Sequence, residues 1–112
     1  MSPSKPVPPY IAGVQKTSIT VGWLPNDEGT GLVDEYTLEY KEMFKQHQQP
    51  QDGWKTLSIQ KWAPAEQLLH IYEKLPPNAS YTFRVKARNK IGWGVFSEPS
   101  EIVTTEASHP DR

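Results

Sequence analysis

The chain has 112 residues, which is enough for one domain and too few for two ordinary ones. Its 12 basic and 13 acidic residues leave a net charge of −1, which argues against a surface built to bind nucleic-acid phosphates. The absence of cysteine excludes disulfides, thiolate metal ligands and a cysteine nucleophile. A chain of this size buries roughly two-thirds of its unfolded surface, so one core can stabilise it without cross-links.

The predicted elements are short strands, recognised by apolar residues at every second position between turn residues. In chain order they cover Tyr10–Val14, Ser18–Trp23, Tyr36–Lys41, Trp54–Leu57, Glu66–Glu73, Tyr81–Arg88 and Ile102–Thr105. Glu66–Glu73 also fits a helical spacing, but Pro64 and Pro76 leave too few residues for a stable helix, so we predict a strand there. Met43–Gly53 is a long polar loop, and Ser58–Gln67 is expected to be irregular.

The clearest pattern lies in the stretch Leu75–Ser97. Its apolar positions alternate with its polar positions, which predicts a strand with one buried and one solvent-facing side. The apolar positions are Tyr81, Phe83, Val85 and Ala87, and the polar ones are Thr82, Arg84, Lys86 and Arg88. Asn89 to Gly94 is predicted to be a turn, and Phe96–Pro99 is expected to continue as a second extended run.

Short strands without βαβ alternation predict an all-β, seven-stranded antiparallel β-sandwich. The domain is expected to cover residues 6–106, between a flexible Pro/Ser-rich lead at 1–5 and a flexible tail at 107–112. No apolar run is long enough to predict a transmembrane helix.

The chain resembles a fibronectin type III domain from about Pro6 to Thr105. The resemblance is carried by Trp23, Tyr36, Tyr40, the run Leu75-Pro76-x-Asn78-x-x-Tyr81-x-Phe83-x-Val85-x-Ala87-x-Asn89, Gly92-x-Gly94 and Ser97. It implies an immunoglobulin-like Greek key of seven strands without catalytic machinery. The expected core residues are Trp23, Tyr36, Leu38, Leu75, Tyr81, Phe83 and Val85. Tyr81 fits a tyrosine corner, in which its hydroxyl would bond to the backbone at Leu75–Asn78.

No constellation in the sequence predicts chemistry. His47, His70 and His109 are far apart along the chain, so they do not suggest a shared metal site. The acidic turn with Asp27 and Glu28 lacks the spacing of an EF-hand. We therefore expect no catalytic, cofactor-binding or metal-binding residues, and no enzyme activity.

Two further sequence features concern the surface of the domain. Asn78-Ala79-Ser80 is an N-glycosylation sequon, although an asparagine at this corner also suits the turn itself. Trp93-Gly94-Val95-Phe96-Ser97 is similar to the WSxWS element of cytokine-receptor modules, with Gly94 and Phe96 as departures. We expect Trp93 to lie over the stem of Arg84 or Arg88, in a cation–π stack formed by Arg84, Lys86, Arg88 and Trp93.

The predicted function is that of a non-catalytic interaction or spacer module of a multidomain receptor, adhesion or scaffold protein. Its partner would be another protein or a neighbouring domain, with no nucleic acid and no membrane insertion, and the isolated domain is expected to be a monomer. Contact is expected through the loops Asn89–Gly94 and Asn26–Glu35. The residues expected to make it are Lys90, Ile91, Trp93, Asp27 and Glu28.

Two alternatives and the compartment stay open. One alternative is a carbohydrate-associated or enzyme-appended module, with Trp54, Trp62 and Trp93 as a stacking platform. The other is a cytokine-receptor-like module. The sequon favours an extracellular part of a membrane or secreted protein, whereas the family that the chain resembles also occurs in intracellular scaffolds.

Overall fold

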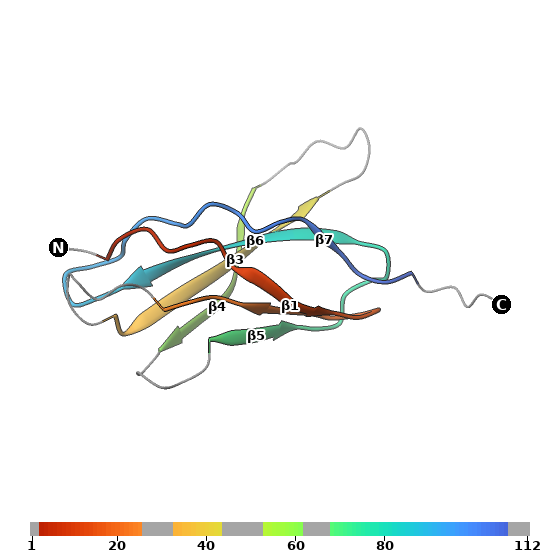
Figure 1. The fold of residues 1–112 in the computed structure, drawn as a ribbon, viewed down its shortest axis with the longest axis horizontal. Coiled ribbons are helices and arrows are strands. Elements are labelled where there is room, and N and C mark those ends of the chain that lie inside the picture. The colour runs from red at the N-terminus through yellow and green to blue at the C-terminus, as the bar shows by residue number, and fades with distance from the viewer. Residues whose placement is uncertain (1–2, 26–32, 44–52, 62–67, 108–112) are drawn as a thin grey trace.

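The computed structural model describes residues 3–25, 33–43, 53–61 and 68–107, which form two antiparallel sheets packed face to face (Figure 1). One sheet has the order β1-β2-β5, with β1 at Tyr10–Val14, β2 at Ile19–Gly22 and β5 at Leu69–Tyr72. The other has the order β4-β3-β6-β7, with β3 at Glu35–Met43, β4 at Lys55–Lys61, β6 at Ser80–Arg88 and β7 at Val103–Thr104. The described residues contain no helix, and the predicted all-β, seven-stranded antiparallel sandwich is confirmed.

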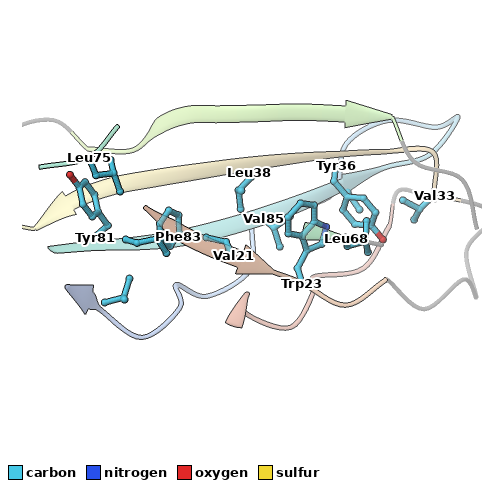
Figure 2. Close-up of a cluster of buried hydrophobic side chains, with 13 residues drawn as sticks. Val21, Trp23, Val33, Tyr36, Leu38, Leu68, Leu75, Tyr81, Phe83 and Val85 are labelled. Carbon is cyan, nitrogen blue, oxygen red and sulfur yellow. The ribbon is translucent and has the colours of Figure 1, made fainter. Parts of the chain in front are cut away.

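The core lies between the two sheets, because β2, β3 and β6 each direct alternate apolar side chains inward. All the side chains expected in the core are buried: Trp23, Tyr36, Leu38, Leu75, Tyr81, Phe83 and Val85. Figure 2 shows Trp23 close to Tyr36 and Leu68. The rings of Trp23 and Tyr36 meet edge to face, with centroids 6.0 Å apart and planes 65° apart.

The corner before β6 is held differently from the expected tyrosine corner. Within the described part of the chain, no hydrogen bond joins the Tyr81 hydroxyl to the backbone of residues 75–78. Instead, the Thr105 hydroxyl donates to the Pro76 carbonyl at 2.8 Å and accepts from the Ala79 N–H at 2.9 Å. The Tyr81 ring packs against Tyr72, with centroids 5.7 Å apart. A threonine from the chain's C-terminal end therefore closes this corner.

Some strand boundaries differ from those expected. β4 continues to Lys61, although Ser58–Gln67 was expected to be irregular, because Ser58, Ile59 and Gln60 pair with β3. The described end of that segment is thus a strand, and residues 62–67 lie outside the described residues. The expected extended run at Phe96–Pro99 belongs to no named strand.

The segment from Gly94 to Ser100 follows β6 with an unusual spacing. The N–H groups of Gly94, Ser97 and Ser100 donate to the carbonyls of Ala87, Val85 and Phe83, so three residues of the segment match two of the strand. In a regular antiparallel pair the two strands match residue for residue. The extra residues of this segment move its carbonyls out of reach of the β6 N–H groups that they would otherwise accept from. The Ser97 and Ser100 hydroxyls take their place, each accepting from the N–H of Val85 or Phe83 at 3.1 Å.

We predict that Ser97→Ala and Ser100→Ala each lower the free energy of unfolding by about 1–3 kcal/mol, because each leaves a buried N–H donor of β6 without an acceptor. Chemical denaturation measures the loss. Ser80→Ala is the control, since its hydroxyl pairs with Thr104 at an exposed position and should cost less. Equal losses for all three variants would contradict the proposed role of the two hydroxyls.

Candidate functional site: a ladder of cations and rings on the outer sheet face

The solvent-facing side of β6 carries three cations in a row. Arg84, Lys86 and Arg88 occupy every second position, so all three point to the same side of the sheet, with neighbours roughly 7 Å apart. On the adjacent strand β3 they face Glu39, Thr37 and Glu35 in turn. The outer two cations therefore face carboxylates, and the middle one faces a neutral threonine.

The two arginines form ion pairs that are partly shielded from water. Arg84 donates through Nε and Nη2 to Glu39 Oε1, at 3.0 and 2.7 Å. Arg88 donates through Nη1 to Glu35 Oε1 at 3.0 Å and to Asp34 Oδ1 at 3.4 Å. The side chains of Glu39 and Glu35 are only 15% and 18% exposed, so solvent screens these pairs less than a fully exposed pair.

Lys86 has aromatic partners. Its Nζ lies 4.7 Å from the ring centroid of Phe96 and 5.0 Å from that of Trp93. No carboxylate pairs with Lys86 among the described residues. Cation–π contacts at such distances stabilise by about 0.5–1 kcal/mol each at exposed sites.

The same rings also contact the arginines. The Arg84 guanidinium carbon lies 3.8 Å from the Phe96 centroid and 4.5 Å from that of Trp54, and the Arg88 carbon lies 6.0 Å from Trp93. Rings and cations thus alternate across the sheet, and we call this set the ladder. In order, it consists of Trp54, Arg84, Phe96, Lys86, Trp93 and Arg88.

The backbone explains why these rings reach the cations. Trp93 forms an isolated bridge to Arg88, and the Gly94 N–H donates to the Ala87 carbonyl at 2.8 Å. The stretched spacing between Gly94 and Ser97 then sets Phe96 beside Lys86 and Arg84. Trp54 enters from the residue before β4, on the far side of β3 from β6.

The structure brings together the four residues expected to form a cation–π stack. Trp93 contacts Arg88, one of its two expected partners, and also Lys86, whereas Arg84 contacts Phe96 and Trp54. The aromatic-x-x-aromatic spacing from Trp93 to Phe96 was the available signal for Phe96. Trp54 had no local signal, because only the β3–β4 pairing places it near β6.

The ladder ends at the base of the loop Asn89–Gly94. The buried Asn89 side chain accepts from the N–H groups of Ile91 and Gly92 at 2.9 and 3.3 Å. Asn89 and Gly92 also exchange two backbone hydrogen bonds of 3.1 Å, with Gly92 at φ +152°, a value that favours glycine. Lys90 and Ile91 are exposed at the tip of this closed turn.

The described end of the loop Asn26–Glu35 lies beside the same base, since the Asp34 N–H donates to the Arg88 carbonyl at 2.9 Å. Asp27 and Glu28 lie outside the described residues, as do Trp62, His47 and His109. Across the described ranges, no group of three His, Cys, Asp or Glu side chains could hold a metal ion, and no helix there could span a membrane.

Asn78 lies on the corner and is exposed. Its φ of +59° is in the left-handed region, which asparagine tolerates better than most residues, and its N–H donates to the Glu106 carbonyl at 3.2 Å. The turn role of Asn78 is thus evident in the backbone, and glycosylation stays a prediction.

Comparison with known proteins places this geometry in a family. The family model described as "Fibronectin type III domain" matches residues 4–103. The chain is 36% identical to protein sidekick-2 of Mus musculus over 111 residues, which cover 97% of this chain and 5% of that protein. It is 28% identical to the neuronal cell adhesion molecule of Gallus gallus, covering 97% of this chain and 8% of that protein. The chain therefore spans only a small part of the relatives that it matches.

Solved structures agree on the fold. Domains A168–A170 from titin match 93% of this chain and 32% of that one, with a TM-score of 0.72 and 25% identity. The twitchin kinase region from C. elegans matches 100% of this chain and 18% of that one, with a TM-score of 0.78 and 24% identity. These similarities support the sandwich architecture.

We predict that Phe96→Ala lowers the free energy of unfolding by about 1–2 kcal/mol, because it removes two cation–π contacts from the centre of the ladder. Val95→Ala is the matched control, since Val95 is 61% exposed and its truncation should cost less than about 0.5 kcal/mol. Thermal and denaturant unfolding measure both variants. A Phe96→Ala loss no larger than that of Val95→Ala would show that the ladder adds nothing to stability.

Proposed function

Because this chain belongs to the fibronectin type III family, we propose that it is a non-catalytic module for protein–protein interaction or spacing within a multidomain receptor, adhesion or scaffold protein. In this proposal, contact is made through the loops Asn89–Gly94 and Asn26–Glu35. The observation that carries it is the tip of the first loop, where Ile91 is 66% exposed on a turn closed by Asn89.

An apolar side chain on a closed turn suits protein recognition for two reasons. The hydrogen bonds of Asn89 fix the turn before any partner arrives, so binding costs little loop entropy. An exposed isoleucine next to Trp93, itself 36% exposed, gives an apolar centre with charged neighbours such as Lys90. Contact surfaces between proteins commonly have this arrangement of an apolar centre and a polar rim.

The relatives support a protein partner. One of them is named a neuronal cell adhesion molecule, and the proposal extends that kind of role to this chain. The described residues offer no metal cluster. An exposed loop on a rigid sandwich suits binding to another protein. We therefore propose a binding role and not a catalytic one.

The shape of the domain supports spacing as well. The described chain enters at one end of its long axis and leaves at the other (Figure 1), and that axis measures 53 Å. Modules joined in this way add length to a multidomain chain. A carbohydrate platform is less favoured, because Trp54 and Trp93 already stack on Arg84, Lys86 and Arg88.

Photo-crosslinking tests the contact. With benzoylphenylalanine in place of Ile91, irradiation alongside a panel of purified adhesion-protein ectodomains should give a covalent adduct with one of them. The same group in place of Ile102, which is 57% exposed away from the loop, should give none. Adducts from both positions would indicate non-specific contact. If neither position gives an adduct, the binding role is wrong and the spacer role remains.

A further inference from the structure

The residues that lead into β1 pack with a regular period of three. Between Pro3 and Pro9, the residues at 3, 6 and 9 are buried prolines, whereas Ser4, Lys5, Val7 and Pro8 are exposed. A polyproline II helix has three residues per turn, so one of its edges presents every third residue. We call residues 3–9 the strap. Its burial pattern is that of a polyproline II segment lying with one edge against the domain.

The strap lies against the segment from Gly94 to Glu98, which also carries Phe96 of the ladder. Figure 1 shows the N-terminal trace beside the segment that follows β6. A Cβ atom built on Gly94 would lie 2.4 Å from the Pro3 carbonyl oxygen, so only glycine allows this approach. Further along, Lys5 Nζ forms an ion pair with Glu98 Oε2 at 2.6 Å. We call residues 94–98 the strap site.

The strap site is held in shape from its other side. The Gly94 and Ser97 N–H groups donate to Ala87 and Val85 of β6, and the Ser97 hydroxyl accepts from Val85. These bonds do not involve the strap, so the site keeps its form when the strap leaves. Glycine at one end and a carboxylate at the other then remain as recognition features.

We propose that the strap site is a binding site for polyproline II segments, filled in cis by the strap and able to take a proline-rich segment of another chain. The ligand class is an extended segment with proline at every third position and a basic residue that reaches Glu98. Such segments bind at low entropic cost because they are already extended before binding. The proposal shares only Gly94 with the loop Asn89–Gly94 and does not involve Ile91 at the loop tip, so it stands apart from the proposed function.

The test uses the full chain with its own strap weakened by Lys5→Glu and Pro6→Gly, labelled with ¹⁵N. The probe is a synthetic peptide of residues 2–10, Ser-Pro-Ser-Lys-Pro-Val-Pro-Pro-Tyr. We expect saturable shifts of the Gly94 and Glu98 amide signals. The unaltered chain should bind the peptide at least about tenfold more weakly, because its strap competes at the high effective concentration of a tethered ligand.

Two matched controls define the site. In the weakened chain, Gly94→Ala should lower the peptide affinity at least about tenfold, because the added methyl would occupy the place of the Pro3 carbonyl. Gly13→Ala should leave it unchanged, since a Cβ there is 3.9 Å from its nearest neighbour. A peptide with alanine at Pro3 and Pro6 should bind at least about fivefold more weakly.

The absence of saturable binding to the weakened chain would overturn the proposal, as would equal binding to the Gly94→Ala chain or by the alanine peptide. Should the weakened chain fail to fold, the single variant Gly94→Ala decides. Its Ser4 and Lys5 amide signals should move to the positions of an unfolded peptide. If these signals keep the positions seen in the unaltered chain, the strap does not pack against Gly94 and the proposal is wrong.

Discussion

Three like charges on one face of a single strand set the main constraint on this domain. Arg84, Lys86 and Arg88 repel one another, and the sheet must compensate each of them. β3 supplies carboxylates at both ends of the row, through Glu39 and Glu35, and a threonine in the middle. Lys86, in the middle of the row, is contacted instead by the rings of Phe96 and Trp93. The ladder therefore fixes the segment after β6 to the outer face of the sheet.

Both faces and both edges of β6 make contacts with other parts of the domain. Its inner face carries Phe83 and Val85 into the core, its outer face carries the ladder, and one edge pairs with β3. The remaining edge pairs with the short strand β7 at Ser80 and Tyr81, and serine hydroxyls accept from its N–H groups at Phe83 and Val85. The loop Asn89–Gly94 continues directly from this strand, and the strap site is hydrogen-bonded to it through Gly94 and Ser97, so β6 positions both.

Sequence could predict what depends on local periodicity. The alternation from Tyr81 to Arg88 predicted both the buried face and the shared face of the three cations, because a strand's side chains point to opposite sides in turn. The partners of those cations depend on pairing between distant segments. A bulge between Leu38 and Glu39 sets the β3–β4 register, so neither Trp54 in the ladder nor the extension of β4 to Lys61 had a local signal. Thr105 at the Pro76 corner was missed for the same reason.

The central claim is that aromatic rings hold Lys86 in place between two arginines. A double-mutant cycle with Lys86→Met and Phe96→Leu measures this interaction most directly, because methionine keeps the aliphatic stem and leucine keeps an apolar side chain. We expect a favourable coupling of about 0.5–1 kcal/mol in the free energy of unfolding. Strictly additive effects, with a coupling below about 0.3 kcal/mol, would contradict it.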